Sequence, residues 1–142
     1  MKAYSAIWYN KNLDYSIIEI NSPPENFNNK RIVLDCANGA TYQVAPTIFW
    51  ELGCEVISIG NQPNGININS QNGAVNVTSL SKKVLETKSD IGFAFDGDGD
   101  RLIIVDEKGS AIDGDKILAL LAKELLANNQ LNKKTVVATI MS

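Results

Sequence analysis

Histidine is absent from the 142-residue chain, and cysteine occurs only twice. The lack of histidine excludes His-containing catalytic triads, His-ligated zinc and acid–base chemistry by an imidazole. Cys36 and Cys54 lie outside any C-x-x-C pattern, so we expect free thiols that pack as small apolar side chains. No apolar run approaches the 18 or so residues of a bilayer span, and Met1–Tyr4 does not open a signal-peptide core. These absences predict a cytoplasmic protein with no membrane partner.

An excess of positive charge is also missing. With 13 basic and 16 acidic residues, the formal net charge is −3. Phosphate backbones attract basic surfaces, so this balance argues against nucleic acid as a partner. The 44% of hydrophobic and 20% of charged residues are ordinary for a globular protein, and 142 residues suffice for one domain with its own core.

Alternating strand and helix patterns begin at residue 31. Runs rich in β-branched and apolar residues predict strands, and apolar spacings of three and four predict helices. The expected strands cover 31–36, 55–59, 91–95, 102–106 and 135–140. The expected helices cover 43–52, with Gly53 as its stop, 78–88, with Thr78 as its cap, and 113–126. Ahead of them, residues 4–20 have a weak helical pattern and the composition of residues 21–30 is typical of a linker.

This order predicts an α/β fold, a three-layer α/β/α domain with a mixed, mostly parallel sheet. Strand–helix–strand units pair in parallel through right-handed crossovers, with helices covering the sheet. Only residues 96–101 separate the strands at 91–95 and 102–106, so these two should form an antiparallel hairpin. The Asn- and Gly-rich segment 60–78 is a long loop of the kind that is often functional.

The hairpin connection carries the strongest chemical signal. Asp96, Asp98 and Asp100 alternate with glycine and are followed at once by Arg101. Two carboxylates about 4 Å apart repel by roughly 4 kcal/mol at an effective dielectric near 20, so three converging acids need a counter-ion. Hard oxygen ligands favour Mg²⁺, Mn²⁺ or Ca²⁺, and an arginine beside them suits bidentate phosphate binding. The segment therefore predicts a divalent-metal site, most simply for Mg²⁺, that serves phosphate chemistry with Arg101 as a catalytic residue.

Three other interpretations stay open. The first is a solvated acidic turn, since Asp and Gly are ordinary turn residues. The second is a calcium module of the EF-hand type, in which Glu107 would stand at position 12, but Arg101 occupies the position that needs glycine. The third is the nucleophile loop of haloacid-dehalogenase-type phosphatases, which segment 93–99 fits locally, although those enzymes usually have Thr or Val where Asp100 stands.

Segment 94–101 (Ala-Phe-Asp-Gly-Asp-Gly-Asp-Arg) resembles the metal-binding loop of the α-D-phosphohexomutase superfamily. Segment 33–40 resembles the opening strand and turn of that family's second domain, and segment 60–69 is similar to a loop of its phosphoglucosamine mutase branch. Residues 105–109 and 113–115 also fit this branch. A departure lies in 71–77, where the family usually has a Cys-Gly-Ser stretch ending in His-Pro.

The resemblance implies an enzyme that interconverts glucosamine 6-phosphate and glucosamine 1-phosphate through a phosphoserine and a bisphosphate intermediate. It implies that Asp96, Asp98 and Asp100 hold Mg²⁺ and that Arg101 contacts phosphate or substrate. A phosphomannomutase or phosphoglucomutase of the same superfamily is the nearest alternative. The partners would be a phosphosugar and the enzyme's other domains, and the phosphoserine motif Ser-His-Asn-Pro is missing.

The same resemblance implies a division of the chain into domains. We expect residues 1–30 to be a remnant of a preceding domain or a linker, and residues 31–134 to form the metal-loop domain. Residues 135–142 would be the first strand of a truncated following domain. A fragment of this kind should be inactive alone.

Overall fold

The computed structural model describes residues 4–7, 17–20 and 27–137, which form a two-stranded and a five-stranded sheet with three α-helices. Strands β1 (Tyr4–Ile7) and β2 (Ile17–Ile20) pair antiparallel. The helical pattern expected over 4–20 is therefore wrong for the eight residues of it that are described. Both strands are only four residues long and pair with each other alone, so a sequence pattern of such length cannot separate them from one helical turn.

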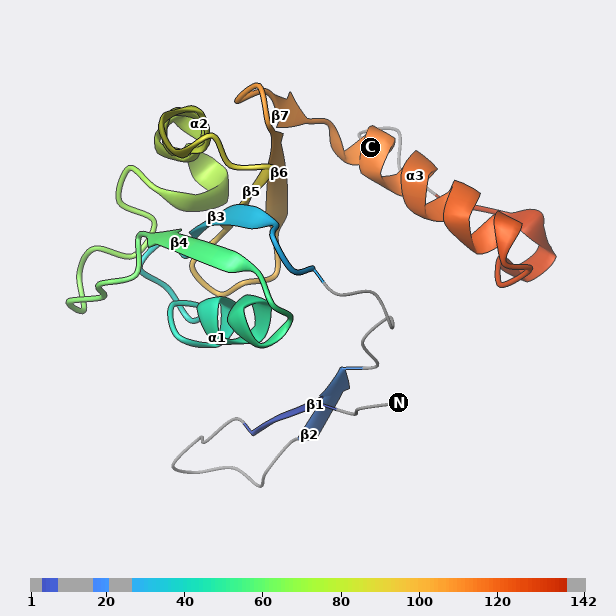
Figure 1. Ribbon diagram of the computed structural model, residues 1–142, viewed down its shortest axis with the longest axis horizontal. Coiled ribbons are helices and arrows are strands. Elements are labelled where there is room, and N and C mark those ends of the chain that lie inside the picture. Colours follow the sequence, from blue (N-terminus) through green and yellow to red (C-terminus); the bar gives the residue numbers. More distant parts are fainter. Residues whose placement is uncertain (1–3, 8–16, 21–26, 138–142) are drawn as a thin grey trace.

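The larger sheet has the strand order β4–β3–β5–β6–β7 (Figure 1). Strand β3 (Arg31–Asp35) lies in parallel between β4 (Glu55–Ile59) and β5 (Ile91–Phe95). Strand β6 (Leu102–Asp106) pairs antiparallel with β5, which confirms the hairpin. The two-residue β7 (Ala111–Ile112) extends the sheet antiparallel to β6 and was not expected.

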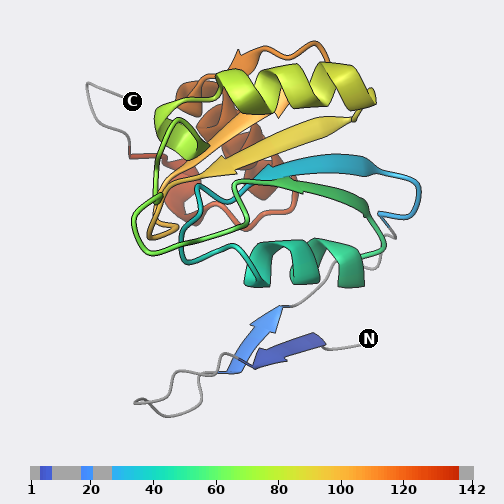
Figure 2. The ribbon, with the colours of Figure 1, turned by 90° about the vertical axis from the view of Figure 1, so that its left-hand side faces the viewer.

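Two helices cover the sheet on opposite faces, so the mixed three-layer α/β/α fold is confirmed (Figure 2). Helix α1 (Val44–Glu51) packs Ala45 against Ile32 and Leu34. Helix α2 (Thr78–Thr87) packs Leu80 and Val84 on the other face. Because side chains alternate along β3, Val33 points to the α2 layer while its neighbours point to the α1 layer.

Capping residues mark some of the helix boundaries but not all of them. Gly53, at φ +89°, ends the α1 segment as expected. Thr78 does not cap α2: Val77 holds the cap position without a side-chain bond, and Asn76 Oδ1 accepts a hydrogen bond from the Thr78 N–H at 3.2 Å. Asp113 caps α3 (Gly114–Ala127) by accepting from the Asp115 N–H at 2.8 Å.

Helix α3 runs away from the sheet (Figure 1) and buries none of its residues, so it is not a layer of the fold. Leu118, Leu120, Leu121, Leu125 and Leu126 are exposed on it. It leads into the 3₁₀ turn η2 (Asn132–Lys134). The strand expected at 135–140 is absent from 135–137, and residues 138–140 lie outside the described part of the chain. In the described residues, none of the helices has the length and hydropathy of a bilayer span.

The exposure of α3 leads to a prediction about stability. Replacing Leu118 and Leu121 with glutamine is expected to change the free energy of unfolding by less than about 0.5 kcal/mol, because exposed side chains away from the core contribute little. Urea unfolding followed by circular dichroism measures this. A loss of several kcal/mol would show that these leucines pack against the rest of the chain.

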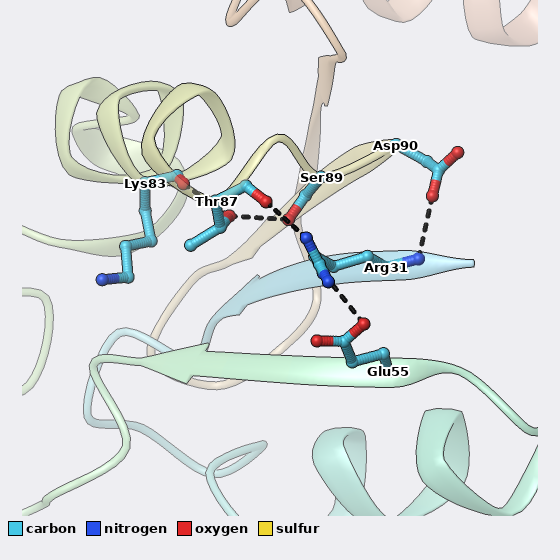
Figure 3. Close-up of polar contacts among 6 residues, drawn as sticks. All are labelled: Arg31, Glu55, Lys83, Thr87, Ser89 and Asp90. Carbon is cyan, nitrogen blue, oxygen red and sulfur yellow. Dashed lines mark hydrogen bonds and ion pairs between the residues drawn. The ribbon is translucent and has the colours of Figure 1, made fainter. Parts of the chain in front are cut away.

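Polar contacts join the amino ends of the three parallel strands (Figure 3). The Arg31 N–H donates to Asp90 Oδ2 at 2.8 Å, and its guanidinium Nη1 donates to the Thr87 carbonyl at 2.9 Å. Arg31 Nε lies 2.9 Å from Glu55 Oε2, an ion pair that lacks hydrogen-bond geometry. Exposed ion pairs contribute about 0–1 kcal/mol each, so the Arg31–Glu55 pair adds little to the stability of the fold.

Both thiols are buried and free, as expected. Burial raises the pKa of Cys36 to about 11 and also raises the pKa of Cys54. Both therefore remain neutral thiols at physiological pH, and neither has the low pKa of a reactive cysteine.

Candidate metal centre

The acidic segment 96–101 connects β5 to β6 at the carboxyl ends of the parallel strands. The Asp96 N–H donates to the Arg101 carbonyl at 3.3 Å, and the Gly99 N–H donates to the Asp96 carbonyl at 3.2 Å. Gly99 takes φ +79°, a backbone conformation that most residues avoid. The hairpin register thus fixes both ends of the loop and the glycine allows it to fold back on itself.

The structure brings the three predicted ligands together. One carboxylate oxygen from each of Asp96, Asp98 and Asp100 lies within 4.8 Å of the other two. Asp96 is 1% exposed, while Asp98 and Asp100 are exposed. The set therefore has one fixed, buried acid and two that face solvent.

Asp96 is held by its own loop. Its Oδ1 accepts hydrogen bonds from the Gly99 N–H at 3.0 Å and the Arg101 N–H at 3.1 Å. Its Oδ2 accepts from Arg101 Nε at 2.7 Å. Although burial raises the pKa of Asp96, these Arg101 contacts outweigh it and hold the pKa of this carboxyl well below its usual range. Asp96 is thus ionised and oriented at neutral pH.

The pKa shifts of the neighbouring groups show that negative charge is concentrated at this site. The Asp96 carboxylate raises the pKa of Asp100, and the charge of Asp98 raises it further. Asp96 also raises the pKa of Arg101, whose Nε lies 3.7 Å from Asp100 Oδ1. Arg101 is 67% exposed at its side chain, so its guanidinium can reach both the acids and a ligand in solvent. A divalent cation would relieve the repulsion among the acids.

The donor chemistry fits such a cation. All three candidate ligands are carboxylate oxygens, which Mg²⁺ and Ca²⁺ prefer over softer ligands. Mg²⁺ commonly binds through a few carboxylates and keeps positions for water or phosphate. Asp96, Asp98 and Asp100 would hold the ion, while Arg101 would remain beside it for a phosphate.

Two segments far away in sequence shape the loop. Gly39, in the turn after β3, packs directly against the Gly97 backbone, and the Ala40 N–H donates to the Gly97 carbonyl at 2.8 Å. A Cβ added to Gly97 itself would lie 2.7 Å from both Asn69 Nδ2 and Ile68 Cδ1. Sequence reasoning missed Gly39, Ile68 and Asn69 as neighbours of the site. The Asn-Gly turn at a strand end hinted at Gly39, and no pattern indicated the other two.

An open pocket of about 560 Å³ lies beside this turn. Its walls come from the turn after β3 and the loop after β4, and none of the lining residues is charged. Two of its amides already accept backbone N–H groups of the loop: Asn38 Oδ1, from the turn, accepts from the Gln62 N–H at 3.1 Å, and Asn67 Oδ1, from the loop itself, accepts from the Asn64 N–H at 2.9 Å. These amides stabilise the long loop itself.

Known proteins match both the sequence and the fold. A family model described as phosphoglucomutase/phosphomannomutase, alpha/beta/alpha domain II, matches residues 9–109. Curated phosphoglucosamine mutases of Zymomonas mobilis, Haemophilus influenzae and Rhizobium leguminosarum are 59%, 58% and 54% identical over 112 residues. These alignments cover 79% of this chain but 25% of each relative, so the chain spans about a quarter of their length.

A solved structure agrees. The crystal structure of a phosphoglucomutase/phosphomannomutase family protein from Burkholderia thailandensis has a TM-score of 0.60 and 37% identity, covering 70% of this chain and 22% of that one. The family model alone matches well over half of the chain. The chain therefore belongs to the phosphoglucomutase/phosphomannomutase family of the phosphohexomutase superfamily and contains its α/β/α domain II.

Proposed function

We propose that this chain is the magnesium-binding domain of a phosphosugar mutase that interconverts glucosamine 6-phosphate and glucosamine 1-phosphate. The observation that carries the proposal is the convergence of three carboxylates within 4.8 Å beside an exposed arginine. The phosphoglucosamine mutases that match at 54–59% identity support the choice of sugar. A phosphoglucomutase or phosphomannomutase is the second candidate, since a solved relative carries that family name.

The chain's own residues would bind and orient phosphate rather than react covalently. Mg²⁺, when bound, supplies Lewis-acid polarisation of a phosphoryl oxygen. Asp96 is fixed by backbone and guanidinium contacts, so it presents its ligand lone pairs with little loss of side-chain freedom. The exposed Arg101 would hold a phosphate oxygen pair beside the ion. Because histidine is absent, the Ser-His-Asn-Pro nucleophile cannot lie in this chain, and another domain would have to supply the phosphoserine.

We further propose that residues 31–134 form the unit that carries the site. Residues 1–30 would be a remnant of a preceding domain or a linker, and residues 135–142 would start a following domain. The match of the α/β/α domain II model to residues 9–109 supports the presence of one such unit, with bounds that differ from those proposed. The enzyme's other domains and a phosphosugar would be the partners, in the cytoplasm.

Calorimetry of the purified chain tests the metal proposal. We expect weak binding of Mg²⁺ and Mn²⁺, because three protein ligands leave the remaining coordination positions to water. The double substitution Asp98→Asn with Asp100→Asn should abolish this binding without unfolding the domain, since both side chains are exposed. Asp115→Asn, an exposed acid of α3, is the matched control and should bind as the original chain does.

Three results would contradict the proposal. Ca²⁺ affinity in roughly the nanomolar range would instead indicate a calcium module. Mutase turnover by the purified chain alone would show that no other domain supplies the phosphate carrier. Hydrolysis of a generic phosphomonoester that is lost on Asp96→Asn would favour the dehalogenase-type phosphatase.

A further inference from the structure

One buried carboxylate has no part in the proposed chemistry. Asp35, the last residue of β3, is fully buried. In the described part of the chain, Asp96 is the only other buried carboxylate. No ion pair involves Asp35 among the described residues. Burial raises its pKa, although two backbone N–H groups lower it. An unpaired buried charge is costly, so its hydrogen bonds must offset a large loss of hydration.

Those hydrogen bonds join two distant segments. Asp35 Oδ1 accepts from the Ala37 N–H at 3.0 Å, inside the turn after β3. Asp35 Oδ2 accepts from the Gly73 N–H at 2.8 Å, 38 residues further along. The carboxylate therefore fastens the end of the long loop, at the 3₁₀ turn η1 (Gly73–Val75), to the end of β3.

Both fastened segments continue to the metal loop. On the loop side, Gly73 packs directly against the carbonyl of Phe95, the residue before Asp96. The Asn69 N–H donates to the Ala37 carbonyl at 2.8 Å, which places the Asn69 side chain against Gly97. On the turn side, Gly39 and Ala40 contact the Gly97 backbone. Gly97, which stands between two candidate ligands, is thus enclosed by the two segments that Asp35 joins.

We propose that Asp35 is a positioning residue for the metal loop: by fastening the 37–40 turn to the 68–73 segment, it sets where Gly97 lies and hence how Asp96 and Asp98 converge. This inference rests on the proposed function, because positioning matters only if the acids bind a cation. The competing explanation is that Asp35 only stabilises the end of β3. That explanation predicts lower stability with an unchanged loop.

The test variant is Asp35→Asn, which keeps the size of the side chain. An amide has one oxygen, so one of the two backbone N–H groups would face an NH₂ group and lose its acceptor. Two controls match it. Asp90→Asn makes the same change at the other end of β3: Asp90 accepts from the Arg31 N–H through one oxygen and from Lys30 Nζ through the other, and the amide keeps only one of these acceptors. Val33→Ala lowers stability from the same strand through a buried apolar group that is not bonded to the loop.

Two measurements are made at a temperature where every variant is folded. The first is amide hydrogen exchange of Gly99 and Ala40, whose N–H groups bond to Asp96 and to the Gly97 carbonyl. The second is Mn²⁺ affinity by calorimetry on the full chain. In Asp35→Asn we expect exchange at both amides to become at least about tenfold faster and affinity to fall about 10–100-fold, as for other residues that orient metal ligands. Val33→Ala and Asp90→Asn should keep the original affinity.

The outcomes separate the two proposals. Original exchange and original affinity in folded Asp35→Asn would overturn the positioning role. If the original chain binds no Mn²⁺, the proposed function fails, and the exchange rates still decide whether Asp35 orders the loop. If Asp35→Asn does not fold, Ile68→Ala takes its place, because Ile68 is exposed and touches Gly97 from the fastened segment. If hydrogen exchange at the Gly99 amide is unchanged in that variant, residues 68–73 do not order the metal loop and the proposal is contradicted.

Discussion

Replacing Leu34 with alanine is expected to lower the free energy of unfolding by about 2–5 kcal/mol, the range for truncating a fully buried leucine. Leu34 is 0% exposed and lies on β3, which has a hydrogen-bonded neighbour on each side. It belongs to the cluster that packs against α1, where the stacked rings of Phe49 and Phe93, with centroids 5.2 Å apart, also lie. A close-packed core around a central strand cannot collapse easily into the cavity, so the cost should be near the upper part of that range.

Urea unfolding at 25 °C measures this effect. Leu120→Ala is the control, because Leu120 is 67% exposed on α3 and the same substitution there should change stability by less than about 0.5 kcal/mol. Equal losses in the two variants would mean that β3 does not form the centre of the core.

Replacing Gly39 with alanine is expected to displace the metal loop. A Cβ on Gly39 would overlap the Gly97 carbonyl and Cα, which are backbone atoms that cannot rotate away. Gly39 does not have a positive φ, so the effect is steric and not one of backbone strain. Overpacking of this kind costs about 1–3 kcal/mol. Because the overlap falls between two candidate ligands, divalent-metal affinity should fall about 10–100-fold as well.

Gly114→Ala is the matched control for Gly39→Ala. Gly114 lies in the first turn of α3, and a Cβ added there would meet no atom within 4 Å, so alanine fits and should raise helix stability slightly. Thermal unfolding and Mn²⁺ calorimetry compare the two variants. Unchanged affinity in folded Gly39→Ala would show that the turn after β3 does not determine the shape of the acidic loop.

Much of the fold could be predicted from local patterns. The apolar runs ending at Asp35, Ile59 and Phe95 form strands as predicted: β3 is mostly buried, β5 alternates buried and half-buried residues, and β4 is partly exposed. The short Asp/Gly connection forced the antiparallel hairpin. Other elements carry no such signal. The two-residue β7 spans a single repeat of the strand pattern, which is too short to be recognised. The apolar face of α3 predicted a helix correctly, but periodicity does not say which surface a helix packs on, and here α3 buries no residue.

Part of the candidate site could likewise be predicted from the sequence, and part could not. Asp96, Asp98 and Asp100 could be named because they alternate within one short segment, and their proximity follows from the loop that contains them. Their role as metal ligands and that of Arg101 in binding phosphate remain predictions. What could not be foreseen is that Arg101 holds Asp96, or that Gly39 and Asn69 enclose Gly97. Those contacts depend on the packing of turns that are distant in sequence, and no single window of residues contains them.

The β5–β6 connection has a consequence for protein engineering. Residues 96–101 contain every acid of the site, so transplanting this hexapeptide into a hairpin of another scaffold would carry all the donor atoms along. The residues that enclose this loop, 37–40 and 68–73, would not be transferred with it. A recipient protein would therefore acquire a negatively charged turn with poor selectivity, and a working graft would need all three pieces at once.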